Sequence, residues 1–97
     1  MRAITVNELG GPEVLLYGDV PAPEPGPGEV LVAARAAGVN FVDTYFRSGL
    51  YPRPLPYIPG TEGAGEVVAL GEGVTGLAVG QRVAWCDAAG SYAEQVV

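Results

Sequence analysis

The sequence contains no histidine and no lysine, and Cys86 is its only cysteine among 97 residues. Without a second cysteine, no disulfide can form inside the chain. Without histidine, the chain lacks the most common general base and the usual imidazole ligand of zinc. Any chemistry therefore has to run without a histidine-dependent triad and without a thiolate or imidazole metal site.

Positive charge and long apolar stretches are also scarce. Five basic residues face eleven acidic ones, which gives a net charge of −6 at neutral pH. Binding to a phosphate backbone needs clustered positive charge, so the composition predicts no nucleic-acid partner. No apolar run approaches the ~20 residues of a membrane-spanning helix, and the first ten residues lack the apolar core of a signal peptide. We therefore expect a cytoplasmic protein without a membrane partner.

The abundant residues predict a single small domain made mainly of β-strands. Hydrophobic residues make up 48% of the chain, and 15 glycines and 9 prolines interrupt them at short intervals. This balance is typical of short strands joined by turns rather than of long helices. One segment, 29–37, fits either a strand or a helix, and its Val/Leu alternation favours a strand. The expected strands cover residues 1–6, 13–20, 29–37, 63–70, 81–86 and 91–97.

One stretch, NFVDTYFRSG, predicts a short helix at about residues 41–48. Asn40 is a good N-cap, and Asp43 follows three residues later, as in a variant of the capping box. Gly49 is a typical residue to end such a helix. Arg47 is interpreted as a solvated residue on the helix surface.

The motif G-x-G-x-x-G, the fingerprint of dinucleotide-binding loops, occurs at 71–76, directly after the expected strand 63–70. In a true fingerprint a helix begins at the glycines, so that its N-terminus faces the pyrophosphate. Here only Leu77–Val79 separate Gly76 from Gly80, and the chain then alternates as a strand does. We therefore interpret the motif as glycine turns and not as a cofactor loop.

Longer motifs resemble a known family. The stretches AAGVNFVDTYFRSGLYP, LPYIPGTEGAGEVVALGEGVTGLAVGQRVAW and GSYAEQVV are closely similar to the N-terminal catalytic part of zinc-independent quinone oxidoreductases. These enzymes form the zeta-crystallin-like branch of the medium-chain dehydrogenase/reductase superfamily. The resemblance extends over essentially the whole chain. It implies a mainly β fold for residues 1–97, a GroES-like, partly open β-barrel with one short helix.

The resemblance also implies how the complete enzyme is organised. In this family a Rossmann domain further along the chain binds NADPH, and the complete enzyme is a homodimer that passes a hydride to a quinone. The 97 residues contain no such domain, so we interpret the sequence as a truncated GroES-like catalytic domain. The isolated chain is expected to be inactive and to bind NADPH weakly at best.

Two positions distinguish this branch from its zinc-dependent relatives. Zinc enzymes of the superfamily carry a cysteine where this chain has Asn40 and a histidine where it has Thr61, and the four-cysteine structural zinc lobe is absent. The resemblance thus implies that no metal is bound, in agreement with the count of cysteine and histidine.

The same resemblance gives candidate site residues. Tyr45 and Tyr51 stand where similar quinone reductases present tyrosines to the nicotinamide ring and the quinone, so they are the candidate catalytic residues. A phenol can stack on a planar acceptor and donate to a carbonyl oxygen that gains negative charge. Asn40 and Thr61 are the candidate cofactor-binding residues. The sequence alone also allows aromatic packing for the tyrosines, helix capping for Asn40 and a strand-edge position for Thr61.

Three other residues are considered as candidates for the site. Asp43 is interpreted as a structural carboxylate at the helix start. Cys86 is interpreted as a small core residue rather than a redox thiol. Glu62 is left open between a surface carboxylate and the buried partner of an arginine outside this chain.

Three functions are compatible with the sequence. The first is NADPH-dependent quinone reduction without zinc. The second keeps the hydride and changes the acceptor to an enone or enoyl substrate, which is also planar and also needs an oxyanion donor. The third is a non-catalytic GroES-like assembly module, in which the apolar strand 91–97 offers an edge for pairing.

Overall fold

The computed structural model describes residues 1–97 and is mainly β, with one α-helix and one 3-10 helix. The predicted short helix is confirmed, since α1 lies within one residue of the expected start. The element bounds are β1 (Arg2–Val6), the 3-10 helix η1 (Pro12–Val14), β2 (Leu15–Asp19), β3 (Val30–Ala37), α1 (Val42–Ser48), β4 (Gly63–Leu70), β5 (Arg82–Trp85) and β6 (Gln95–Val96).

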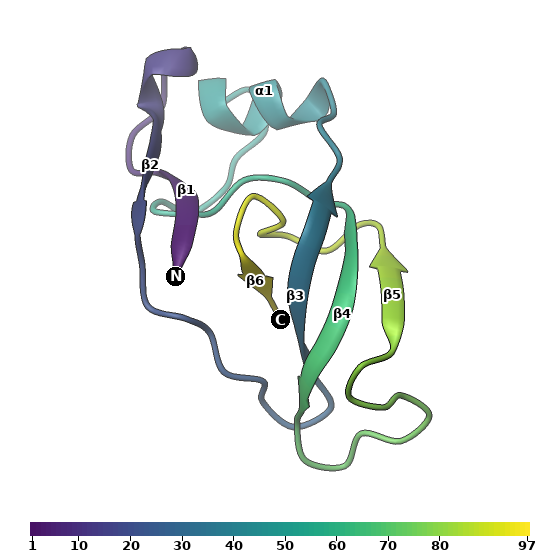
Figure 1. The fold of residues 1–97 in the computed structure, drawn as a ribbon. Coiled ribbons are helices and arrows are strands. Elements are labelled where there is room, and N and C mark those ends of the chain that lie inside the picture. The colour runs from purple at the N-terminus through teal and green to yellow at the C-terminus, as the bar shows by residue number, and fades with distance from the viewer.

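The strands form two antiparallel sheets that do not close into a barrel (Figure 1). β1 pairs with β2, and the second sheet has the strand order β5-β4-β3-β6. Two isolated bridges join β1 to other segments: Ala3 pairs with Ala93, and Val6 pairs with Tyr57. α1 lies at one end of the molecule, beyond the tip of β3 (Figure 1). This open arrangement is consistent with the predicted GroES-like partial barrel.

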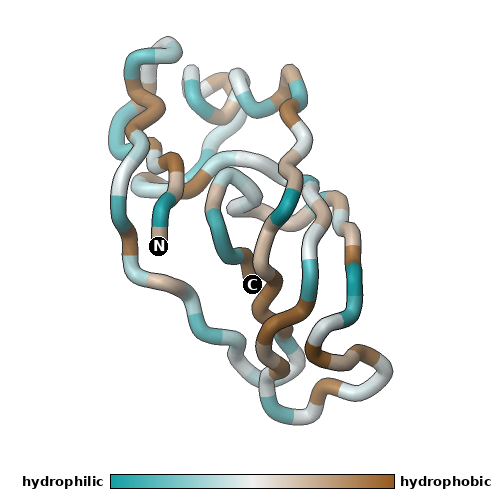
Figure 2. The backbone as a smooth tube through the Cα atoms, in the orientation of Figure 1, coloured by the Kyte–Doolittle hydropathy of each residue, from teal (hydrophilic) through white to brown (hydrophobic).

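A small core of short aliphatic side chains is formed by residues of both sheets and of η1. Because successive side chains of a strand point to opposite faces, each strand contributes only alternate residues. Val67 in β4 is 1% exposed, and Val6 in β1 is fully buried. Figure 2 shows hydrophobic residues gathered along β3 and β4, with hydrophilic positions between them. The buried hydrophobic residues are Ala3, Val6, Val14, Val32, Val67 and Val96.

The glycine-rich segment 71–76 forms turns, as predicted, and no helix follows it before β5. Gly73 and Gly76 have φ values of 79° and 84°, which glycine adopts at little cost and residues with a side chain rarely adopt. Gly71 donates its N–H to the carbonyl of Glu29 at 2.7 Å. The segment therefore connects β4 to β5 and presents no helix N-terminus to a phosphate.

Three sequence-based expectations about local structure are wrong. Residues 13 and 14 were expected in a strand, but they belong to η1, because Pro12 at its first position has a fixed φ suited to a helical turn. The last strand is shorter than expected, since only Gln95–Val96 pair with β3. Cys86 is exposed rather than in the core. It follows the end of β5 and shares the exposed side of that strand with Arg82.

The only α-helix has seven residues. No helix of the chain has the length and hydrophobicity needed to cross a membrane.

Candidate active site

The start of α1 is held by a hydrogen bond from backbone to side chain. Asp43 Oδ2 accepts from the N–H of Asn40 at 3.1 Å, and the N–H of Asp43 donates to the carbonyl of Asn40 at 3.0 Å. This is the carboxylate half of the predicted capping box, and it supports the structural interpretation of Asp43. The other half is absent, because no side chain caps the helix. The prediction that the Asn40 side chain acts as the cap is therefore wrong, and its amide remains available to a ligand.

A cavity of about 260 Å³ lies beside the start of α1. The hydroxyl of Tyr92 donates to Asp43 Oδ2 at 2.8 Å, across 49 positions of sequence. The other oxygen, Asp43 Oδ1, is buried and has no hydrogen-bond partner. The cavity is lined by Leu15, Val39, Asn40, Asp43, Thr44, Arg47, Pro59 and Tyr92.

Burial and hydrogen bonding keep the hydroxyl of Tyr92, in the wall of this cavity, protonated. Burial, together with the hydrogen bond to Asp43, raises the pKa of Tyr92 to about 12. The Tyr92 hydroxyl is therefore a proton-bearing donor at neutral pH. Arg47 also belongs to the wall: it is half-buried, and its Nε donates to the carbonyl of Gly10 at 3.3 Å. The expectation that Arg47 is solvated is therefore wrong, because the fold brings the loop before η1 against the helix.

The two candidate catalytic tyrosines lie together in an aromatic group. The rings of Tyr45 and Tyr51 are 5.2 Å apart between centroids, in an edge-to-face arrangement. Tyr45 also meets Phe41 at 5.5 Å, and Tyr51 meets Phe46 at 5.8 Å. Tyr51 is 46% exposed and Phe41 is 75% exposed. Half-exposed rings at these separations give a surface on which a planar molecule can stack.

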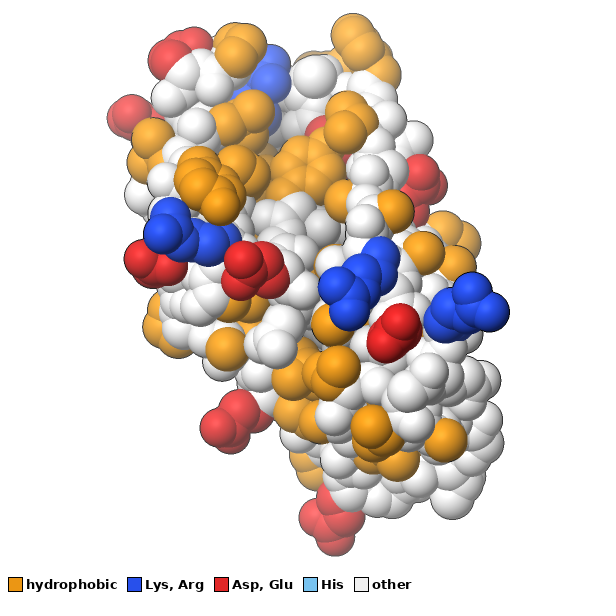
Figure 3. All heavy atoms as spheres, in the orientation of Figure 1, with side chains coloured by type: hydrophobic (Ala, Val, Ile, Leu, Met, Phe, Trp, Pro, Cys, Tyr) orange, Lys and Arg blue, Asp and Glu red, His pale blue; other side chains and the backbone are white.

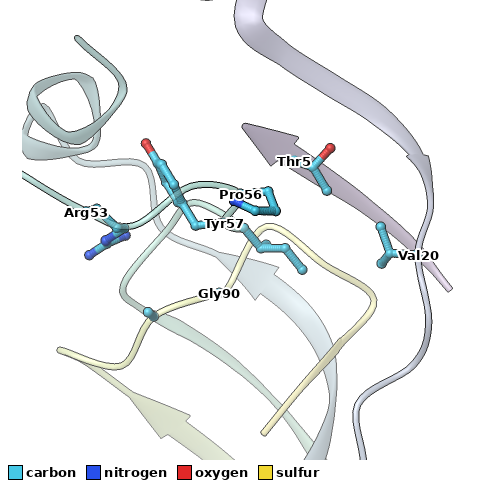
Figure 4. Close-up of a pocket in the computed structure, with 8 residues that line it drawn as sticks. Thr5, Val20, Arg53, Pro56, Tyr57 and Gly90 are labelled. Carbon is cyan, nitrogen blue, oxygen red and sulfur yellow. The ribbon is translucent and has the colours of Figure 1, made fainter. Parts of the chain in front are cut away.

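A second cavity, of about 400 Å³, lies between the loop after α1 and the start of the chain (Figure 4). Arg53 lies over the ring of Phe46 at 3.8 Å and over that of Tyr57 at 5.2 Å. Burial raises the pKa of Tyr57, and the positive charges of Arg53 and Arg47 oppose this effect. The cavity is lined by Thr5, Val20, Arg53, Pro56, Tyr57, Ile58, Ala89 and Gly90.

Sequence reasoning missed Arg53, Tyr57 and Tyr92. The only signal for Arg53 was an arginine within a proline-rich loop, and Tyr92 lay in an expected strand. Across the face shown in Figure 3, acidic and basic side chains form a band near the middle, and hydrophobic side chains lie both above and below it.

Thr61, the second candidate cofactor-binding residue, lines neither of these cavities. Its carbonyl accepts from the N–H of Ala88 at 3.0 Å, which joins it to the segment after β5. The structure places Asn40 in the cavity beside the start of α1 but does not bring Thr61 into that cavity. Glu62 is half-buried against Gly38, where an added Cβ would meet its carboxylate. Residues 1–97 contain no group of three or more His, Cys, Asp or Glu side chains arranged to hold a metal ion.

Comparison with known proteins gives consistent matches. The family model of the alcohol dehydrogenase GroES-like domain matches residues 26–97. A quinone oxidoreductase of Pseudomonas aeruginosa is 59% identical over 95 residues, which is 96% of this chain and 29% of that protein. The chain therefore spans less than a third of the length of this curated relative.

Solved structures agree in fold. A quinone oxidoreductase of Escherichia coli in complex with NADPH superposes with a TM-score of 0.95 at 42% identity, over 99% of this chain and 30% of that chain. A 2-haloacrylate reductase superposes with a TM-score of 0.87 at 38% identity, over 98% of this chain and 28% of that chain.

Proposed function

The chain belongs to the alcohol dehydrogenase GroES-like domain family, and from this membership we propose that it forms the catalytic part of an NADPH-dependent quinone oxidoreductase. The pair Tyr45 and Tyr51 carries the proposal: the rings lie 5.2 Å apart beside the helix whose start carries Asn40, in a chain 59% identical to a quinone oxidoreductase. The nucleotide-binding part is proposed to lie outside these residues, since the chain spans 29% of that relative.

The residues present fit such a reaction. NADPH supplies the hydride when it is bound. The exposed face of a ring in this aromatic group offers an apolar surface against which a planar acceptor can be held. A tyrosine hydroxyl stabilises the carbonyl oxygen of the acceptor as negative charge develops there. The Asn40 amide caps no helix N–H, so its donor and its acceptor are free for the cofactor. Thr61 stays a prediction for this role.

We further propose that no zinc takes part. The chemistry of the donor set supports this, because zinc in enzymes is held mainly by imidazole and thiolate ligands. The chain has no histidine, and its single cysteine is exposed just after β5. An amide at Asn40 and a hydroxyl at Thr61 replace the thiolate and the imidazole of zinc-dependent relatives.

The test is Tyr51→Phe in the complete enzyme, which removes the hydroxyl and keeps the ring. We expect kcat with benzoquinone to fall about 100- to 1000-fold, in keeping with the loss of one donor to a developing oxyanion. KM for NADPH should change little, because the substitution leaves the stacking surface intact. Tyr17→Phe is the matched control, since Tyr17 is 68% exposed on β2. Unchanged kcat in Tyr51→Phe would remove its hydroxyl from the mechanism.

A second function is favoured by one observation, the similarity to a 2-haloacrylate reductase. A haloacrylate is an unsaturated acid, so that protein is named for an acceptor with a conjugated carbon–carbon double bond. The aromatic surface and the oxyanion donor proposed here suit an enone as well as a quinone. Rates with benzoquinone and with a simple enone distinguish the two, and a clear preference for the enone would favour the second function.

Location, assembly and partners also belong to the proposal. The complete enzyme is expected to be a cytoplasmic homodimer that binds neither nucleic acid nor membranes. The net charge of −6 supports the absence of a nucleic-acid partner.

A further inference from the structure

We propose that Tyr92 is a positioning residue: its hydroxyl, bound to Asp43, sets the place of the α1 start and of the Asn40 amide in the active site. The inference rests on the proposed function and adds to it a residue that acts on the site through Asp43, because its hydroxyl already donates to that carboxylate.

α1 needs such an anchor because packing holds it weakly. The helix has seven residues, and none of them is buried. Isolated helices shorter than about 12–15 residues are marginal in water, and most helical stability in proteins comes from a packed apolar face. The position of α1 therefore depends on the specific hydrogen bonds that tie it to the rest of the fold.

Tyr92 makes one of these bonds, and its own backbone is held in place by hydrogen bonds. Its N–H donates to the carbonyl of Pro59 at 3.0 Å, and its carbonyl accepts from the N–H of Ile4 at 2.9 Å. The segment is thus fixed on two sides before its side chain reaches the helix. The hydroxyl then donates to Asp43 Oδ2 at 2.8 Å. A hydrogen bond from a hydroxyl to a carboxylate is charge-assisted, and such bonds are stronger than those between neutral groups.

The carboxylate of Asp43 connects Tyr92 to Asn40. The same oxygen, Oδ2, accepts from the N–H of Asn40 at 3.1 Å, so Tyr92 and Asn40 share one acceptor. Asp43 lies in the first turn of α1, two residues before Tyr45. A shift of this carboxylate therefore moves the Asn40 backbone and the beginning of the helix together.

The far end of α1 has a separate anchor. The N–H of Gly10 donates to the carbonyl of Arg47 at 3.0 Å, and Arg47 Nε donates back to the carbonyl of Gly10 at 3.3 Å. The C-terminal end stays fixed when the Tyr92 hydroxyl is removed, so the displacement falls on the end that carries Asn40. Asp43 makes this displacement larger, because its other oxygen, Oδ1, is already buried without a hydrogen-bond partner. Loss of the bond to Oδ2 leaves this carboxylate still less satisfied, which favours its movement toward solvent.

The experiment compares Tyr92→Phe with Tyr17→Phe in the complete enzyme. We expect Tyr92→Phe to lower kcat with benzoquinone about ten-fold or more, because small displacements of aligned groups are costly. KM for NADPH should rise only modestly, because the nucleotide-binding part proposed outside this chain holds most of the cofactor, and Tyr17→Phe should match the wild type. In an Asp43→Ala background, which removes the shared acceptor, Tyr92→Phe should have no further effect on kcat, since both changes break the same link.

Two results would overturn the inference. One is an unchanged kcat in Tyr92→Phe, even with a lower melting temperature, since that pattern describes a purely structural bond. The other is an effect of Tyr92→Phe on kcat that multiplies independently with the effect of Asp43→Ala.

A complete enzyme that reduces no quinone would refute the proposed function instead. The link from Tyr92 through Asp43 to Asn40 is then tested on this chain by NMR, through the backbone amide resonance of Asn40. A shifted resonance and faster hydrogen exchange in Tyr92→Phe, with no change in Tyr17→Phe, would support the link. An Asn40 amide unaffected by Tyr92→Phe would overturn it.

Discussion

Gly65→Ala tests a close contact between β4 and β3. Gly65 lies in β4 opposite Ala34 of β3, and it is buried. A Cβ added there would overlap the carbonyl oxygen of Ala33, which is backbone and cannot rotate away. Since ordinary carbon contacts lie near ~3.5 Å, the two strands have to separate to admit a methyl group.

The expected loss combines three contributions. Separation of the strands weakens about two ladder hydrogen bonds, each with a net value of about 1 kcal/mol. The strain that remains in an overpacked contact adds about 1–3 kcal/mol. Against these, alanine lowers the entropy of the unfolded chain, which returns about 0.4–1 kcal/mol. We therefore expect Gly65→Ala to lower the free energy of unfolding by about 2–4.5 kcal/mol, a large share of the ~5–15 kcal/mol typical of a domain.

Urea unfolding followed by fluorescence measures this loss, since Trp85 is the only tryptophan and lies in β5, the neighbour of β4. Gly18→Ala is the matched control: Gly18 lies in β2, an added Cβ meets nothing within 4 Å, and its φ is not positive. The control should stay within about 0.5 kcal/mol of the wild type. A Gly65→Ala chain that also stays within this range would refute the clash as the reason for glycine. If Gly65→Ala shows no cooperative unfolding transition, its loss is at least as large as the free energy of unfolding of the wild type.

Two further outcomes are expected. Because the pKa of Tyr92 is raised to about 12 in the folded state, above the ~10 of an unfolded tyrosine, its contribution to stability is complete below pH 10 and is lost as the pH rises toward 12. With allowance for solvent screening the loss is about 1 kcal/mol, and urea unfolding at pH 9 and pH 11.5 should show a smaller decline in Tyr92→Phe than in the wild type; equal declines would contradict it. Cys86 is exposed, so a thiol reagent should label it in the native chain, and labelling only at the rate of unfolding would contradict this.

The strand pattern was predictable because it is local. Alternation of side chains and the positions of glycine predicted β4 at residues 63–70, the range that the structure shows. The same reasoning rejected the motif at 71–76 as a cofactor loop, since too few residues follow for a helix. Local sequence also indicated α1, because its capping and ending residues lie within one or two turns of it.

The site was predictable only in part, because its long-range contacts leave no local signal. The bond between Asp43 and Tyr92 joins positions 49 apart, and no spacing rule relates them. Arg47 was expected in solvent, because its partner Gly10 lies 37 positions away. The exposure of Cys86 depended on where β5 ends, which alternation alone does not determine. Tyr45 and Tyr51 were selected through the family resemblance, and the residues alone would have been assigned to ordinary packing.

The way α1 ends explains why these two tyrosines meet. Six positions do not bring two side chains to one face of a helix, because neighbours on a helix are three or four apart. Gly49 instead has a left-handed φ of 89°, which turns the chain back so that the N–H of Tyr51 donates to the carbonyl of Tyr45 at 3.1 Å. The tyrosine pair is thus set at the C-terminal end by this turn, and the start of α1 is set by Asp43. Since the helix contributes no buried residue, hydrogen bonds and turn geometry place the site more than the aliphatic core does. Changes in the core should therefore affect mainly stability, and changes at the two ends of α1 should affect catalysis.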